Sequence, residues 1–302
     1  MADNAGFRIR QHLPPGAPLM FQRIGLTQSP LHQNAPPGLR AWLESAEAAR
    51  VKSVKEVTID GVRCVVKRRR PSVMRGLSYV LRYLRAFLLG LGCKILLGEF
   101  PRPGVLLRNG LEYEAQRLRR LLQTGCRVPE VWWQEPGTVV LEYVGESLPP
   151  LLRQADTAER LRLTRMLAAD LAAFHVRGLW HGGAQVRNVT MRDGLLWRID
   201  FEENIGGALS LPLAQAYDLY QTLNSVIALG RIPDADRPVM GKLILETYFD
   251  VNPDPAVRAA LNRLARIICG LARVLQPLAG KIPGSDVRAF FRVADTLRSF
   301  LR

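Results

Sequence analysis

The spacing of apolar residues changes along the chain from a strand-like to a helix-like pattern. Two β-rich runs within residues 51–68 flank Asp60-Gly61, a dipeptide that favours the tight turn of a β-hairpin. Two further strands are predicted, one beginning in VPEVWW (128–133) and one over 137–144, which is apolar until Glu142. This part of the chain therefore predicts a small sheet.

Helical spacing dominates the remainder. An amphipathic helix is predicted over 109–123, and a longer one over 156–178 with Asp156 or Thr157 as its N-cap. Further helical patterns occupy residues 212–229, 236–249, 255–277 and 285–301. We expect an α+β fold with two lobes: an N-terminal arm with the first N-lobe strand over 1–50, a small strand-rich N-lobe over 51–145, and a larger helical C-lobe over 146–302.

The stretch 76–97 is both apolar and basic, and its pattern predicts an amphipathic helix or helix pair. Arg82, Arg85 and Lys94 interrupt any apolar run long enough to span a bilayer. Two interpretations remain open. The helix packs on the domain itself, or it lies on an anionic membrane surface.

Composition narrows the class of partner. The chain has 302 residues, 48% of them hydrophobic, which is enough to bury a sizeable core. Its 42 Lys and Arg against 27 Asp and Glu give a net charge of +15, which either favours a polyanionic partner or simply keeps the protein soluble. Candidate polyanions are nucleic acid, anionic lipid and phosphorylated glycolipid. The basic residues are spread over the chain without an RNP-like or helix-turn-helix pattern, so a nucleic-acid partner is not expected.

The cysteines and the N-terminus indicate a cytoplasmic protein. Cys64, Cys93, Cys126 and Cys269 are far apart and form no CxxC pair, so neither a disulfide framework nor a structural zinc site is expected. The first residues, MADNAGFRIR, contain no apolar segment typical of a secretory signal. Peripheral attachment to the inner face of the cytoplasmic membrane is expected if 76–97 binds lipid.

Residue types suited to phosphoryl transfer occur in a distinctive order. A nucleoside triphosphate carries several negative charges, and its transition state spreads charge over the transferred oxygens, so catalysis is mostly positioning and counter-charge. Carboxylate and amide oxygens are the ligands that Mg²⁺, a hard cation, prefers. In order along the chain the candidates are Lys67, Glu114 with Glu112 close by, Leu141-Glu142-Tyr143, HGGAQVRN (181–188) and IDFE (199–202).

This order resembles the protein-kinase-like superfamily, over about residues 50–230. The bacterial phosphotransferase branches, which are the aminoglycoside and choline kinase type and the lipopolysaccharide kinases, are the most similar. The resemblance implies a bilobal fold that binds ATP and Mg²⁺. By this resemblance, Lys67 binds the α- and β-phosphates and Glu114 holds Lys67; Asn188 and Asp200 ligate Mg²⁺; Glu142, Tyr143 and Val144 form the hinge that meets adenine; and His181 and Asp218 order the catalytic loop.

Each candidate also has an ordinary structural interpretation. Lys67 could belong to the basic run 67–70, and Glu114 could pair with Arg117, three residues on along a solvated helix face. Asp200 could cap a turn. However, a carboxylate that directly follows apolar residues is costly unless a positive group meets it, which favours a functional Asp200.

The loop departs from the family pattern at Gly183, five residues before Asn188, where an aspartate normally orients the acceptor hydroxyl and takes its proton. Glycine also permits a positive φ, which would reshape the loop. Two accounts compete. The chain is a pseudokinase, or transfer continues with another base or with none. The candidate substitutes are Glu202 and Glu203, with Gln185 as a group that orients the acceptor. A positioned base contributes roughly 10²–10⁴-fold, so its loss need not abolish transfer.

The sequence therefore predicts an ATP- and Mg²⁺-dependent kinase that acts on a hydroxyl of a sugar or glycolipid, such as a lipopolysaccharide precursor. Two alternatives are kept. One is a nucleotide-binding pseudokinase with a regulatory or scaffolding role. The other is a protein Ser/Thr kinase, which the absence of a GxGxxG lid before Lys67 disfavours.

Overall fold

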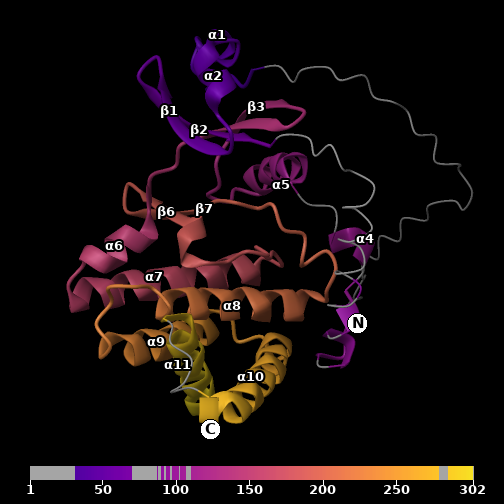
Figure 1. Cartoon of the computed structure of the whole chain (residues 1–302), viewed down its shortest axis with the longest axis vertical. Coiled ribbons are helices and arrows are strands. Elements are labelled where there is room, and N and C mark those ends of the chain that lie inside the picture. The colour runs from indigo at the N-terminus through magenta and orange to yellow at the C-terminus, as the bar shows by residue number, and fades with distance from the viewer. Residues whose placement is uncertain are drawn as a thin grey trace, which may run out of the picture.

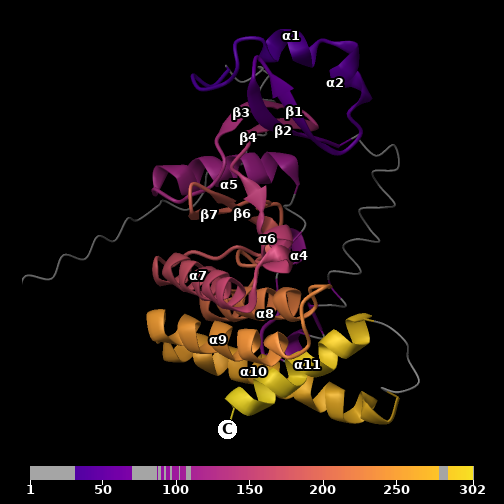
Figure 2. The same cartoon turned by 90° about the vertical axis from the view of Figure 1, so that its left-hand side faces the viewer.

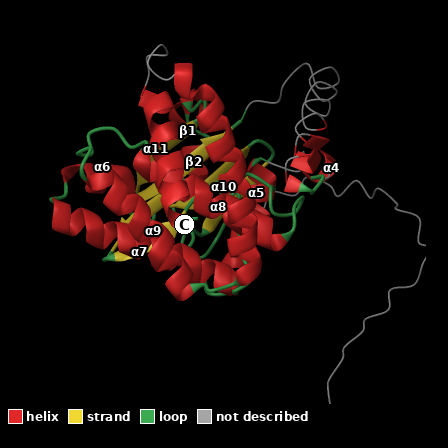
Figure 3. Ribbon diagram, turned by 90° about the horizontal axis from the view of Figure 1, so that it is seen from below, coloured by secondary structure: helices red, strands yellow, loops and turns green. Residues whose placement is uncertain are grey.

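The computed structural model describes residues 31–69, 87, 90, 91, 93–95, 97–101, 103–106, 110–278 and 285–301. The start of the predicted N-terminal arm and most of the predicted basic helix 76–97 lie outside these residues. The elements form layers along the longest axis of the molecule, with the N-terminal sheet at one end and α9, α10 and α11 at the other (Figure 1, Figure 2). Seen from below, these helices lie in front of the strands (Figure 3).

The N-terminal sheet is antiparallel and four-stranded, in the order β1-β2-β4-β3. The predicted hairpin over 51–68 is confirmed, and both turn residues have positive φ, 49° at Asp60 and 78° at Gly61, as a tight hairpin turn requires. The strands are β1 (Val54–Ile59), β2 (Val62–Arg68), β3 (Val131–Glu135) and β4 (Thr138–Glu142).

Successive side chains of the sheet point to opposite faces, and each face has its own core. On one face Val139 and Leu141 pack with Leu118 of helix α5 (Leu111–Gln123). On the other, Val140 packs in a cluster that includes Leu39 of helix α1 (Leu39–Leu43). Helix α2 (Ala46–Arg50) follows α1, so two short helices occupy part of the region where the sequence predicts an arm. The short helix α4 (Pro103–Leu106) precedes α5.

A second, three-stranded sheet and the C-terminal helices form the rest of the molecule. The predicted N-cap of α7 is confirmed, because the Asp156 carboxylate accepts a 2.8 Å hydrogen bond from the Glu159 amide. The long helices match the predicted ones, whereas α6 and the short strands β5–β7 were not predicted as a unit. The elements are β5 (Glu146–Ser147), α6 (Leu148–Gln154), α7 (Thr157–Val176), η1 (Val186–Asn188), β6 (Val189–Arg192), β7 (Leu195–Arg198), α8 (Leu211–Ile227), α9 (Asp236–Val251), α10 (Pro255–Leu275), η2 (Gln276–Leu278) and α11 (Ser285–Phe300).

The predicted fold class is confirmed: the protein is α+β, with an antiparallel-sheet lobe and a helical lobe. Across the described ranges, none of the helices is long and apolar enough to cross a bilayer.

Candidate functional site

The candidate site forms around an ammonium group between the two lobes. Lys67, on β2, donates to both carboxylate oxygens of Glu114 on α5, at 2.8 and 3.0 Å, and to Asp200 Oδ1 at 2.9 Å. Lys67 and Glu114 are 47 residues apart in the sequence, and Asp200 is 133 residues from Lys67. These three candidates therefore converge, and Lys67 does not belong to a solvated basic run.

A third carboxylate completes this group. Glu202 Oε1 lies 3.9 Å from Lys67 Nζ, and its other oxygen pairs with Arg69. Carboxylate oxygens of Glu114, Asp200 and Glu202 all lie within 4.8 Å of one another. An all-oxygen set of this kind fits a hard cation such as Mg²⁺, which could relieve the repulsion among the three carboxylates. Asp200 has φ 67°, a conformation that non-glycine residues rarely adopt and that often marks a functional site.

Burial and neighbouring charges shift the pKa values of Lys67 and Glu114. Burial acts to lower the pKa of Lys67, but the charges of Glu114 and Asp200 outweigh it, so its pKa is raised above the usual value. Burial raises the pKa of Glu114 to about 6, although Lys67 pulls it the other way. At neutral pH the pair is therefore ionised, with Glu114 the more easily neutralised member.

The loop 181–188 is held from below by Asp218 on α8. The Asp218 carboxylate accepts hydrogen bonds from the amides of His181 and Gly182, the latter at 2.8 Å. His181 Nε2 meets the Ile199 carbonyl at 3.1 Å, and Nδ1 accepts from the Gly183 amide at 3.1 Å. Burial lowers the pKa of His181 to about 3, so the ring is neutral and fully used in these bonds. The contacts of His181 and Asp218 agree with the loop-ordering roles that the resemblance implies.

Gly183 does not adopt the positive φ that a glycine permits. The left-handed residue is Gly182, with φ 94°, where an added Cβ would lie 2.8 Å from the Glu203 carbonyl oxygen. At Gly183 the backbone is ordinary, and a Cβ would lie 3.5 Å from Asn188 Nδ2, which is normal contact. The loop is not reshaped by this glycine, and a side chain fits at position 183.

The remaining loop candidates lie close to Gly183. Asn188 is buried, and its Nδ2 donates to the Gly183 carbonyl at 2.8 Å. The backbone N–H of Gln185 donates to the same oxygen at 2.7 Å. Glu203 follows Glu202, and partial burial raises the pKa of its carboxyl. Thus the loop is compact, while Glu202 itself is engaged by Arg69 and Lys67.

The predicted hinge connects β4 to β5. Glu142 accepts a 2.6 Å bond from Arg192, and the Val144 carbonyl accepts a 2.7 Å bond from Thr190 Oγ1. The Tyr143 hydroxyl donates to Glu146 at 2.7 Å, and the Arg63 guanidinium stacks on the Tyr143 ring. These contacts tie the segment to β6, and its role in meeting adenine stays a prediction.

Arg117 was not predicted as a site residue. The alternative in which it pairs with Glu114 is wrong: Glu114 faces Lys67, while Arg117 donates to the carbonyls of Trp180, His181 (2.8 Å) and Glu203 (3.3 Å). Helical spacing placed Glu114 and Arg117 on neighbouring turns, but no sequence signal indicated that they contact different parts of the molecule.

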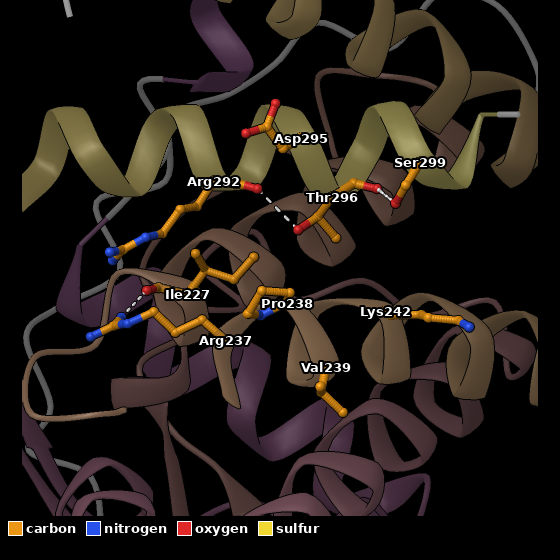
Figure 4. Close-up of a pocket in the computed structure, with 9 residues that line it drawn as sticks. All are labelled: Ile227, Arg237, Pro238, Val239, Lys242, Arg292, Asp295, Thr296 and Ser299. Atoms are coloured by element: carbon orange, nitrogen blue, oxygen red, sulfur yellow. Dashed lines mark hydrogen bonds between the residues drawn. The ribbon is translucent and has the colours of Figure 1, made fainter. Parts of the chain in front are cut away.

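A separate cavity of about 520 Å³ lies in the helical lobe between α9 and α11, at the opposite end from β2 (Figure 1, Figure 4). Its charged groups already have partners. Arg237 and Arg292 both pair with Asp234, at 3.2 and 2.9 Å, and Lys242 pairs with Glu246 at 3.5 Å. It contains none of the predicted site residues.

Comparisons with known proteins found a partial match in sequence and a weak match in structure. No family model matches the sequence. The chain is 34% identical over 91 residues to the KEOPS complex subunit Bud32 of Pyrococcus abyssi; the match covers 29% of this chain and 41% of Bud32. The chain thus matches less than half the length of this relative. A solved structure of a MAP kinase from Leishmania major aligns with 84% of this chain and 81% of its own at 11% identity, with a TM-score of 0.29.

The antiparallel-sheet lobe, the helical lobe and the contacts of Lys67 are consistent with the protein-kinase-like fold that the sequence resembles. Neither similarity is to a lipopolysaccharide or sugar kinase.

Proposed function

We propose that the chain is a Mg²⁺-dependent, ATP-binding phosphotransferase whose acceptor is a Ser or Thr hydroxyl of a protein. The observation that carries this proposal is the convergence of Lys67, Glu114 and Asp200. A buried lysine held by a glutamate is suited to bind phosphate oxygens, because its position is fixed and its charge is retained.

The residues that would hold the metal are Asp200 and, by the resemblance, Asn188, with the Glu202 carboxylate near that of Asp200. Mg²⁺ would supply counter-charge for the phosphates. The chain's own contribution is orientation: Glu114 fixes Lys67, and the Asp218 carboxylate fixes the backbone of the loop that carries Asn188. With both parts fixed in advance, little reorganisation is needed when the nucleotide binds.

The proposed acceptor differs from the sequence prediction. A sugar or glycolipid acceptor has no support in the comparisons, and the match to Bud32 favours the protein-kinase alternative. Attachment of 76–97 to an anionic membrane stays a prediction.

A second candidate function, a nucleotide-binding pseudokinase, is favoured by Gly183. A side chain at this position fits beside Asn188 and His181, so the backbone does not require glycine there. The lack of a carboxylate is therefore a chemical difference at the acceptor side of the site, which leaves the nucleotide side intact.

The binding half of the proposal is tested by calorimetric titration of the full chain with Mg·ATP. We expect wild type to bind and Asp200→Asn to bind at least about tenfold more weakly, because it loses a charge-assisted contact. The matched control is Asp193→Asn, the same change in the exposed β6–β7 turn, where binding should equal wild type. Equal affinity in all three proteins would overturn the proposal.

The transfer half is tested with γ-labelled ATP and a mixed protein acceptor such as casein, beside a sugar acceptor. We expect label on protein, and an increase of roughly 10²-fold or more in Gly183→Asp, which supplies the missing base. Binding without transfer in wild type, with transfer gained in Gly183→Asp, would favour the pseudokinase. Label on the sugar alone would overturn the proposed acceptor.

A further inference from the structure

Arg117 is a half-buried cation whose guanidinium contacts aromatic rings and main-chain oxygens. Its guanidinium carbon lies 3.6 Å from the centre of the Trp180 ring and 5.0 Å from that of Phe201. Its nitrogens donate to the carbonyl oxygens of Trp180, His181 and Glu203. Within the described part of the chain, no carboxylate lies within ion-pair distance of it. The hydrogen bonds that hold its guanidinium therefore go to main-chain oxygens.

This arrangement is costly unless every contact is made. Burial lowers the pKa of Arg117 to about 10, although Tyr113 and Asp218 act to raise it, so the group stays charged at neutral pH. The carbonyl oxygens and the two aromatic rings contact the guanidinium directly. The planar guanidinium can donate in several fixed directions at once, which one ammonium cannot do. An arginine is therefore better suited to this position than a lysine.

The three carbonyls belong to two different segments. Trp180 and His181 lead into the loop that carries Asn188, and Glu203 follows Asp200 by three residues. Arg117 sits one helical turn after Glu114 on α5. Helix α5 thus contacts Lys67 through Glu114. One turn later, through Arg117, it contacts both the 180–188 loop and the 200–203 segment.

We propose that Arg117 is a positioning residue, which registers α5 against the 180–188 loop and the 200–203 segment so that Lys67, Asn188 and Asp200 face one nucleotide. This inference rests on the proposed function. Displacing α5 would pull Glu114 away from Lys67, and Arg117 resists that displacement because its three bonds would break together. The residue acts through the loops and touches no ligand itself.

The test compares Arg117→Lys with Arg119→Lys in the full chain. Arg119 lies on the same helix and bonds the Gln134 side chain at 2.6 Å, away from the loops, so it is a matched control. We expect Arg117→Lys to weaken Mg·ATP binding about tenfold at a temperature well below its Tm, with Arg119→Lys close to wild type. A lowered Tm with unchanged Mg·ATP affinity would mean a purely structural role and would overturn the proposal.

Hydrogen–deuterium exchange without nucleotide gives an independent readout. In Arg117→Lys the amides of 180–183 and of 200–203 should both exchange faster than in Arg119→Lys, since both segments lose their common anchor. Unchanged exchange at either segment would overturn the registering role. If wild type does not bind Mg·ATP, the proposed function fails, while the exchange result still decides whether Arg117 positions the two segments.

Discussion

Two polar clusters lie on either side of the 181–188 loop, and they are stabilised in opposite ways. The charged cluster consists of Lys67, Arg69, Glu114, Asp200 and Glu202, joined by ion pairs across the lobes. The Asp218 network consists of Asp218, His175, Tyr248 and Asn252, together with the amides of His181 and Gly182. The first holds five charges and the second holds one.

The charged cluster has an excess of negative charge and is partly open to solvent. Three carboxylates face two cations, and the side chain of Asp200 is 39% exposed. Its like charges repel one another, so a bound cation or a shift of Lys67 toward an anion would redistribute the contacts at small cost. The cluster is suited to change when a ligand enters.

The Asp218 network has no such freedom. Asp218 is fully buried, and burial alone would raise its pKa, but bonds from His175 and the loop amides lower it below the usual value. His175 Nδ1 lies 2.7 Å from the Tyr248 hydroxyl, which Asn252 also contacts at 3.0 Å. Every member is paired, so the network holds the loop backbone in one arrangement, whereas the charged cluster is suited to change.

The largest expected effect comes from Asp218→Asn. The amide group keeps the shape of the side chain but presents a donor where two backbone amides and His175 require an acceptor. We expect a loss of about 3 kcal/mol in the free energy of unfolding, because at least one buried donor is left unpaired. Urea denaturation followed by circular dichroism measures it.

The control for this change is Asp234→Asn. The Asp234 side chain is 74% exposed although it pairs with two arginines, so its loss should stay within about 0.5 kcal/mol. Similar losses in the two variants would mean that the buried network is no more rigid than a surface ion pair, and the contrast between the clusters would disappear.

Of the charged cluster, Lys67, Glu114, Asp200 and Glu202 were identified from their order along the chain and the resemblance that this order carries, whereas Arg69 was not identified. Lys67 and Asp200 also carry a charge in a costly place. Lys67 ends an apolar strand and Asp200 follows one, so both require partners. The members of the Asp218 network carry no such signal: His175, Tyr248 and Asn252 lie within or next to helices whose pattern predicts only burial. Asp218 itself was predicted by resemblance alone.

Contacts between distant segments and very short elements escaped sequence analysis for a physical reason. Periodicity reports which face of a helix is buried, and so it predicted α5 but not that Arg117 meets the loops. Strands β5, β6 and β7 have two to four residues each, which is too short to show an alternating pattern. Which of the two glycines adopts a positive φ depends on what the loop packs against, and the sequence does not show this. A positive φ was therefore considered at Gly183, whereas the structure has it at Gly182.

Alanine substitutions at Gly182 and Gly183 are expected to have the next largest effect on stability. Comparing the two variants shows how tightly the Asp218 network holds the loop. In Gly182→Ala the new Cβ meets the Glu203 carbonyl at a residue with positive φ, and we expect a loss of about 2 kcal/mol. In Gly183→Ala the methyl group fits, so stability should stay within about 1 kcal/mol of wild type and could increase. Thermal unfolding of both variants measures this, and equal losses would show that the loop relaxes around either residue.

The smallest effect concerns the pH dependence of the charged cluster. Glu114 has a pKa of about 6 in the folded protein against 4.5 for the free side chain. A raised pKa means that its contribution to stability is complete below about pH 4.5 and is lost as the pH rises through 6. The unfolding free energy of wild type should therefore fall, relative to that of Glu114→Gln, by about 1.5 kcal/mol between pH 4.5 and 7.

Denaturant titrations at several pH values isolate the pH dependence of the charged cluster, because carboxylates outside the cluster are common to both proteins and cancel in the difference. Glu112→Gln, an exposed change two residues away on α5, should run parallel to wild type. A difference between wild type and Glu114→Gln that stays constant across this range would mean that Lys67 fully offsets the burial of Glu114. The charged cluster would then be as fixed as the Asp218 network.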